Sequence, residues 1–137
     1  KSYMLKITKT VEYALISIKH IKNSNPKKLH SSKEIADHYN LPYELLSKIL
    51  QKLCKLGYLK GIKGAYGGYK LSKCLDDIKL INFLEEIEGP IGFAQCSIKS
   101  DCKCDQINLC NIKSPIDKIN SNIRNLLSQT TLNEITT

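Results

Sequence analysis

The sequence predicts a mainly α-helical protein with one small β-hairpin, and three observations support this fold class. Apolar residues recur every three or four positions over residues 7–21, 41–53 and 112–127, which is the spacing of amphipathic helices. A glycine-rich stretch at residues 58–72 instead indicates two short strands around a turn. With 137 residues and 42% hydrophobic composition, the chain is long enough to bury a core without disulfide bonds.

Two helices are predicted before residue 40. The first ends before the sequence NSNP at residues 23–26, and a short second helix begins at Ser31, because Ser31 and Glu34 have the spacing of a capping box. The apolar residues of the first helix are Ile7, Val11, Ala14, Leu15, Ile18 and Ile21. Those of the second are Ile35, Ala36 and Tyr39.

A third helix is predicted from about Pro42 to about Leu56, with Gly57 as a left-handed cap. Its apolar side consists of Leu41, Leu45, Leu46, Ile49, Leu50 and Leu53. The opposite side is polar and cationic, and consists of Tyr43, Glu44, Ser47, Lys48, Gln51, Lys52 and Lys55. One face is therefore expected to pack and the other to meet solvent or a partner.

The hairpin is predicted at residues 58–62 and 69–71, with Lys60, Lys63 and Lys70 along it. Helix, short helix, helix and basic hairpin is the order of a winged helix-turn-helix domain, which we place at residues 4–75. In that architecture the third helix enters the DNA major groove, and the hairpin lies against the phosphate backbone or the minor groove.

The charge distribution agrees with DNA as the partner of this domain. The net charge is +8, but residues 1–73 hold 15 lysines against four acids, whereas residues 74–137 hold six basic and nine acidic residues. Many lysine-rich proteins merely have solvated surfaces, so the charge supports DNA binding only together with the hairpin. His20, His30 and His38 lack a nucleophile partner at a recognisable spacing, so we do not expect an enzyme.

Residues 76–137 are predicted to form two further helices around a cysteine-rich loop at about residues 92–111. The first opens at Asp76-Asp77 and ends at Gly89-Pro90, and the second begins at Ser114-Pro115. In the second, Ile112, Ile119 and Leu126 are spaced seven apart, as are Ile116 and Ile123. Such a seam either docks on its own domain or forms a homodimer contact, and a twofold dimer would suit a palindromic operator.

The loop holds four cysteines, in the sequence CSIKSDCKCDQINLC at residues 96–110. No apolar run has the length of a membrane span and none resembles a signal sequence, so we expect no membrane association and a cytoplasmic location, where clustered thiols bind metal rather than form disulfides. The gaps of five, one and five residues differ from the close pairs of structural zinc sites. They favour a polynuclear iron–sulfur cluster, with zinc, a disulfide or free thiols as alternatives.

The chain resembles the Rrf-type winged-helix transcription regulators over nearly its whole length from Met4. The segments that carry the resemblance are LKITKTVEYALISI at residues 5–18, SSKEIADHYNLPYELLSKILQKLCKLGYLKGIKGAYGGYKLS at 31–72, INFLEEIEGP at 81–90, the cysteine loop, and TTLNEI at 130–135. The resemblance implies a dimeric DNA-binding repressor or activator. Its 2Fe–2S or 4Fe–4S cluster would sense nitric oxide, redox state or iron–sulfur status.

The resemblance also implies site residues. The family usually has three loop cysteines, and the set Cys96, Cys104 and Cys110 keeps its common five-residue gap, with Cys102 as the alternative or additional ligand. Glu12 matches an acidic position from which the first helix of the partner subunit contributes a ligand in some members. The predicted DNA-binding residues are Ser32, Tyr43, Glu44, Ser47, Lys48, Lys52, Lys63 and Tyr66. We expect Cys54 and Cys74, far from the loop in sequence, to be packing or surface residues.

Two other functional classes fit parts of the sequence. One is a cluster-free or zinc-bound DNA-binding regulator that senses oxidants through its thiols. The other is a small electron-transfer or cluster-carrier protein, which should lack the basic hairpin.

Overall fold

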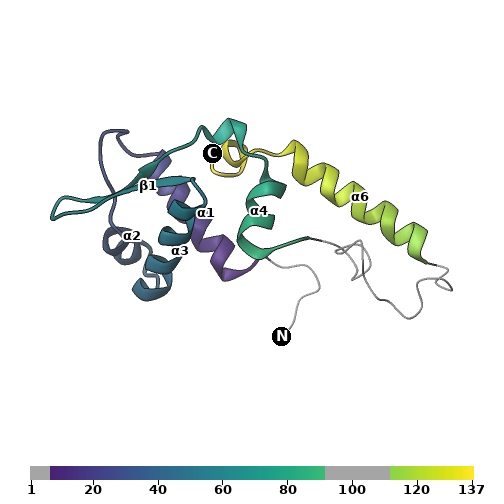
Figure 1. Cartoon of the computed structure of the whole chain (residues 1–137), viewed down its shortest axis with the longest axis horizontal. Coiled ribbons are helices and arrows are strands. Elements are labelled where there is room, and N and C mark those ends of the chain that lie inside the picture. The colour runs from purple at the N-terminus through teal and green to yellow at the C-terminus, as the bar shows by residue number, and fades with distance from the viewer. Residues whose placement is uncertain (1–6, 92–111) are drawn as a thin grey trace. The chain divides into compact units, whose positions relative to one another are not determined.

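A computed structural model describes residues 7–91 and 112–137 of the chain, and Figure 1 shows helices accompanied by one hairpin. The chain divides into two compact units: the first extends to Asp77 and includes Thr136 and Thr137, and the second is Ile78–Ile135. The elements of the first unit are α1 (Lys9–Lys22), α2 (Ser32–Tyr39), α3 (Tyr43–Lys55), β1 (Leu59–Ile62), β2 (Gly68–Leu71) and a 3₁₀ turn (Leu75–Asp77). Those of the second unit are α4 (Leu80–Glu88), α6 (Lys113–Gln129) and α7 (Leu132–Ile135).

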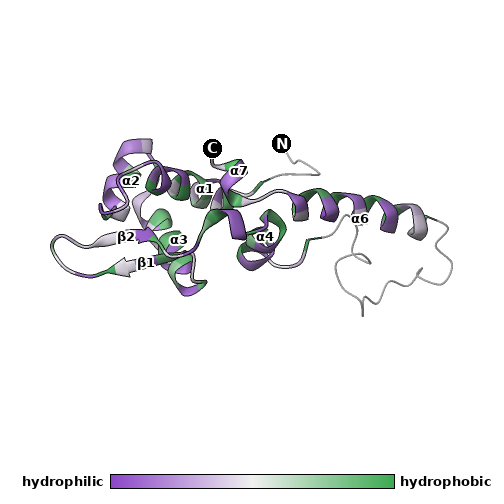
Figure 2. Cartoon of the chain, turned by 90° about the horizontal axis from the view of Figure 1, so that it is seen from above, coloured by the Kyte–Doolittle hydropathy of each residue, from purple (hydrophilic) through white to green (hydrophobic). Residues whose placement is uncertain are grey.

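The core of the first unit lies between α1, α2 and α3, and hydrophobic residues recur along these helices in Figure 2. Its most deeply buried apolar residues are Val11, Ala14, Ile18, Ile35, Leu46, Leu50 and Leu53. Three residues of the predicted stripes do not join it, and one of them is Tyr39 at the end of α2, with 37% of its surface exposed. Ile7 is exposed because it precedes Thr8, the residue that caps α1 through a hydrogen bond to the Val11 amide. Leu45 is 38% exposed because it lies beside Glu44 in the exposed first turn of α3.

The predicted caps at Ser31 and Gly57 are confirmed in the first unit, and the structure adds a cap at Asn40 that was not predicted. The Ser31 hydroxyl accepts a hydrogen bond from the Glu34 amide and so caps α2, and Asn40 ends this helix with a left-handed φ of 54°. Gly57, directly after α3, has a φ of 88°, which a residue with a side chain adopts only with strain. Local chemistry alone therefore determines where these helices start and stop.

The two strands form an antiparallel hairpin in which Leu59 pairs with Leu71 and Ile62 pairs with Gly68. The turn between them requires glycine at position 67, because a Cβ there would lie 2.1 Å from the Ile62 carbonyl oxygen. A Cβ on Gly68 would lie 2.8 Å from backbone atoms of His30, which pairs with Tyr69 as an isolated bridge. The root of the hairpin is thus held closely against the segment that leads into α2.

In the second unit, α4 begins later than the sequence predicted. Asp76 and Asp77 belong to the separate 3₁₀ turn, and Lys79 precedes α4 without a side-chain cap. The chain stays extended here because the Leu80 amide donates to the Thr130 carbonyl and the Leu132 amide donates to the Ile78 carbonyl. The backbone around Leu80 thus pairs with a segment about fifty residues later in the chain, and the helix begins only after this pairing.

Helix α6 packs beside α4 and exposes part of its apolar seam. The Arg124 guanidinium contacts the Glu85 carboxylate at 2.8 Å and donates to the Ile91 carbonyl at 3.0 Å, which fastens α6 to α4. Ile112, Ile119 and Leu126 are 54%, 45% and 64% exposed, whereas Ile116 and Ile123 are half-buried. None of the described helices has the length and apolar character needed to span a membrane.

Candidate DNA-binding interface

A hollow of about 660 Å³ opens in the first unit between the start of α2, the polar side of α3 and the hairpin. Three predicted DNA-binding residues line it from the helices, namely Ser32, Tyr43 and Ser47, and Lys63 lines it from the hairpin turn. Tyr43 is 54% exposed and Ser47 is half-buried, so both can meet a ligand. Ser32 is only 8% exposed, so it reaches the hollow by one edge.

The other predicted DNA-binding residues surround the hollow. Glu44, Lys48 and Lys52 lie on the exposed side of α3. Tyr66 stands at the tip of the hairpin with 95% of its surface exposed. An aromatic side chain this exposed does not pack within its own chain, so it is accessible to another molecule.

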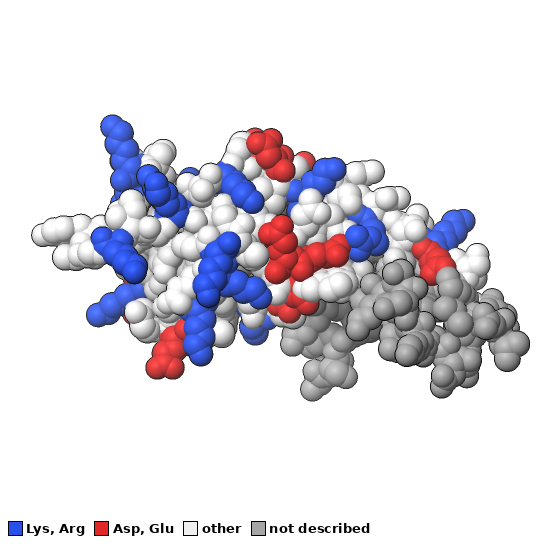
Figure 3. All heavy atoms as spheres, in the orientation of Figure 1, with Lys and Arg blue, Asp and Glu red and all other residues white. Residues whose placement is uncertain are grey.

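The sequence prediction missed residues that also line the hollow, including Lys33, Gln51 and Lys55. The Gln51 amide donates to the Ser47 hydroxyl at 3.4 Å, one turn earlier on α3. Periodicity placed Gln51 and Lys55 on the polar side of α3, but only the fold shows that the first turn of α2 brings Lys33 to the same hollow. In Figure 3, lysine side chains project from the part of the molecule where Figure 1 draws α2, α3 and the hairpin.

Cys54 forms part of the wall of the hollow on α3, and a Cβ on Gly61 would lie 3.6 Å from its sulfur. Burial raises the pKa of the Cys54 thiol, because desolvation disfavours the thiolate. Cys74, after the hairpin, is exposed. Each cysteine was expected to be a packing or a surface residue: Cys54 is partly packed and Cys74 lies at the surface.

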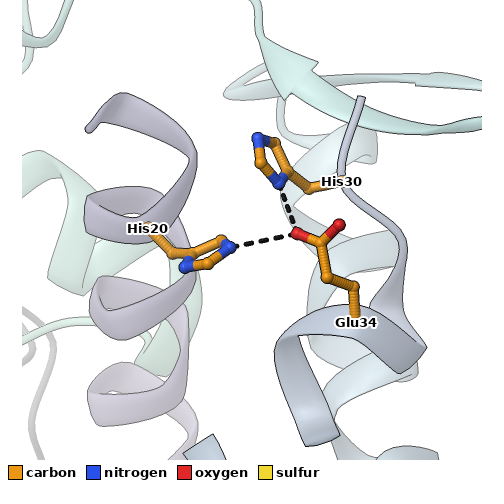
Figure 4. Close-up of side chains that lie close together, drawn as sticks. All are labelled: His20, His30 and Glu34. Atoms are coloured by element: carbon orange, nitrogen blue, oxygen red, sulfur yellow. Dashed lines mark hydrogen bonds and ion pairs between the residues drawn. The ribbon is translucent and has the colours of Figure 1, made fainter. Parts of the chain in front are cut away.

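Beside this interface, two histidines and a glutamate form the histidine–glutamate cluster, which consists of His20 on α1, His30 before α2 and Glu34 on α2. Figure 4 shows both imidazole rings pointing at the same carboxylate oxygen of Glu34. Nε2 of His20 lies 3.0 Å and Nδ1 of His30 lies 2.5 Å from that oxygen. Sequence reasoning assigned Glu34 to a capping box and the histidines to ordinary positions, because no local pattern links residues on separate elements.

The surroundings of Glu34 act on its pKa in opposite directions. Burial raises the pKa, but the hydrogen bonds from His30 and His20, together with the nearby charges of His30 and Lys28, lower it by more. The Lys28 ammonium is 3.8 Å from the second carboxylate oxygen. The net effect is a lowered pKa, so this carboxylate is ionised at neutral pH and available as an acceptor or a ligand.

The predicted cluster ligands Cys96, Cys102, Cys104 and Cys110 lie outside the described residues. Glu12 is described: it lies in the first turn of α1, its side chain is 46% exposed, and its carboxylate is 3.2 Å from the Lys9 ammonium. An ion pair this exposed contributes little to stability, so Glu12 could change partners at little cost.

Residues 7–137 match the model of the Rrf2 family, which is described as an iron-dependent transcriptional regulator. The chain belongs to the Rrf2 family. The HTH-type transcriptional regulator NsrR of Bacillus licheniformis is 28% identical over 131 residues, which cover 96% of this chain and 92% of that protein. The regulators of this family bind DNA, typically as dimers. The relatives of this chain are transcription regulators rather than enzymes.

Solved Rrf2-family structures have the same fold. CymR, the global cysteine regulator of B. subtilis, superposes with a TM-score of 0.73 at 26% identity, covering 96% of both chains. IscR of T. potens superposes with a TM-score of 0.69 at 26% identity, covering 96% of this chain and 85% of that chain. The predicted family and the predicted winged-helix fold class are confirmed.

Proposed function

We propose that this Rrf2-family chain is a homodimeric repressor or activator that binds a palindromic operator, and that an iron–sulfur cluster held by residues 96–110 sets its DNA affinity. The observation that carries the proposal is the coexistence in one chain of an exposed cationic helix and hairpin with four soft thiol ligands in fifteen residues. The signal would be nitric oxide, redox state or iron–sulfur status.

The exposed side of α3 is suited to reading bases. Tyr43, Glu44, Ser47 and Lys48 lie together in its first two turns, and recognition helices contact base edges with their N-terminal residues. Ser can donate or accept a hydrogen bond with several bases, Lys donates to guanine and Glu accepts from cytosine. Together these side chains could distinguish different bases in the operator. The lysines that flank them, together with Lys63 on the hairpin, would neutralise phosphates.

The sensing residues are proposed from their chemistry. Cysteine thiolates are the usual ligands of 2Fe–2S and 4Fe–4S clusters, and Cys96, Cys104 and Cys110 with Cys102 supply three or four of them. Glu12 would supply a carboxylate from the partner subunit, which its exposure permits. The cluster, when bound, supplies one-electron chemistry and reactivity toward nitric oxide. The thiols and the partner subunit's Glu12 would hold the cluster, so its loss would remove this link between the subunits.

Dimerisation is proposed at the exposed seam formed by Ile119 and Leu126 of α6 and by Ile112, which directly precedes this helix. These side chains recur every seven residues and each leaves about half or more of its surface exposed. Side chains that are apolar, exposed and in heptad spacing gain free energy by packing against a second copy of the same helix. A twofold contact there would present two copies of α3 to two half-sites.

Anaerobic purification with iron and sulfide analysis tests the cluster. We expect a coloured protein with iron and sulfide in equal amounts, whose affinity for its operator changes at least tenfold when nitric oxide is added. Replacing Cys102, Cys104 and Glu12 one at a time should identify the ligands, and Cys74→Ser is the matched control because Cys74 is an exposed cysteine outside the segment. A colourless protein without iron would overturn the cluster proposal.

A cluster-free regulator that senses through its thiols is the second candidate. CymR, whose structure resembles this chain, is named the global cysteine regulator, and this name refers to a thiol compound rather than to a metal. In that case the protein would bind its operator without iron and lose affinity on oxidation, and a reductant would restore it. The electron-carrier alternative is set aside, because the basic hairpin that it should lack is present and the family consists of transcription regulators.

A further inference from the structure

The histidine–glutamate cluster has the donor atoms of a transition-metal site. One ligand atom from each of His20, His30 and Glu34 lies within 4.8 Å of the others. In a tetrahedral zinc site with bonds of 2.0–2.2 Å, two ligand atoms lie about 3.4 Å from each other. Small side-chain rotations would therefore bring all three ligand atoms to bonding distance of one shared ion. Two imidazoles and one carboxylate form a donor set used by zinc, with a fourth position left for water.

The positions of the three residues suit a metal that enters from solvent. The side chains of His20 and Glu34 are 15% and 34% exposed, which leaves an access path, whereas His30 is 1% exposed and held by packing. The second ring nitrogen of His20 lies 2.9 Å from the Tyr39 hydroxyl. A partner of this kind fixes the ring orientation and tautomer of a metal-bound histidine, and its loss typically weakens metal affinity 10–100-fold.

The cluster joins parts of the first unit that are separate in the sequence. His20 lies near the end of α1 and Glu34 in the first turn of α2. The His30 amide donates to the Tyr69 carbonyl at 3.1 Å, and the Tyr69 amide donates to the His30 carbonyl at 2.7 Å. An ion bound to all three side chains would therefore fasten the root of the hairpin to both helices.

We propose that His20, His30 and Glu34 bind one divalent transition-metal ion of the zinc class, which locks the hairpin root against α1 and α2. This site lies wholly within the DNA-binding unit and uses none of the cysteines. It is therefore independent of the proposed iron–sulfur cluster, and either can exist without the other.

Metal binding is tested on the full chain with Cys96, Cys102, Cys104 and Cys110 replaced by serine, so that the loop thiols do not compete for the ion. After chelation and dialysis, the protein is titrated with Zn²⁺, and with Co²⁺ as a spectroscopic probe. We expect one equivalent of either ion, with a Co²⁺ spectrum that shows d–d bands but no thiolate charge-transfer band. No binding, or a thiolate band, would overturn the proposal.

Single substitutions in the same background identify the ligands. Glu34→Gln and His20→Gln each remove one ligand and should weaken Zn²⁺ binding at least 100-fold, and Tyr39→Phe should weaken it about tenfold. His38→Gln is the matched control, since the His38 ring lies 5.3 Å from the His20 ring but is not part of the cluster. The exposed Tyr39→Phe change keeps every ligand, so it remains informative if a ligand variant folds poorly. Equal binding by all four variants would contradict the assignment.

Locking of the hairpin is measured separately by amide hydrogen exchange. Saturating Zn²⁺ should slow exchange of the His30 and Tyr69 amides, which form the bridge, by at least fivefold in the parent protein and not in Glu34→Gln. Unchanged exchange in the parent would show that the ion binds without holding the hairpin and would overturn that half of the proposal.

Discussion

Helices α3 and α6 are both amphipathic, but they differ in what they expose. The buried residues of α3 are Leu46, Ile49, Leu50 and Leu53, and its other side presents hydroxyls, a carboxylate and lysines. Helix α6 is half-buried along Ile116 and Ile123 and presents Ile112, Ile119 and Leu126 to solvent. The same periodicity thus serves two kinds of partner, because a charged exposed face suits a polyanion and an apolar exposed face suits another apolar face.

The largest expected effect comes from placing a charge in the α6 seam. Ile119→Asp would put a carboxylate at the proposed twofold contact in both subunits. Complete burial of one such side chain is worth about 1.5–3 kcal/mol, but only the 45% of Ile119 that is exposed can be buried at the contact, so for the two copies together the dimer should dissociate about ten- to 100-fold more readily. Sedimentation equilibrium measures this change.

Ser121→Asp is the matched control, because Ser121 is exposed on the opposite side of α6 and the same residue type is introduced. It should leave the dimer intact. If both substitutions, or neither, dissociate the dimer, the comparison between the exposed faces of α3 and α6 fails.

The next largest effect is expected on α3. Lys48→Gln removes a cationic side chain from the base-reading turns, and loss of a good base contact costs about 1–3 kcal/mol. Selection of binding sites from random DNA, by the parent and by the variant, should show reduced preference at one position of each half-site. Lys19→Gln makes the same change at an exposed position of α1 that does not line the hollow, and should leave the preference unaltered.

A smaller and different effect is expected on the hairpin. Lys63→Gln should weaken binding equally for all sequences and reduce the slope of log K against log salt concentration by about one, because one phosphate contact and its counterion release are lost. Lys118→Gln on α6 should not change the slope. A sequence-dependent effect at Lys63 would mean that the hairpin reads bases.

Local signals in the sequence predicted the first unit well and the second less well. Ser31 and Gly57 act within one turn of their own helices, so residue type was enough to predict those helix ends. The start of α4 was wrong because the segment around Leu80 pairs with residues near Thr130, and no local pattern encodes that pairing.

The histidine–glutamate cluster was missed for a similar reason. Its donors come from three places in the chain, and Glu34 also fitted a capping box, which is a sufficient local explanation of that residue. The cysteine ligand set stays a prediction, because residues 96–110 lie outside the described part of the chain.

The smallest expected effect is on the reactivity of the Cys54 thiol, which lies on α3 in the wall of the hollow. In the chain whose four loop cysteines are replaced by serine, Cys54 is half-buried and Cys74 is exposed. Only the thiolate reacts with iodoacetamide, and a raised pKa lowers the thiolate fraction at any given pH. Cys54 should therefore react several-fold more slowly than Cys74 near pH 7.5.

The pH dependence separates the pKa effect from simple steric shielding. Because burial raises the pKa of Cys54, its reaction rate should keep increasing with pH above the ordinary thiol pKa of about 8.5. Peptide mass spectrometry after timed alkylation gives both rates in one sample. A Cys54 rate that stops increasing at about pH 8.5 or below would mean that the wall of the hollow blocks the reagent without desolvating the thiol.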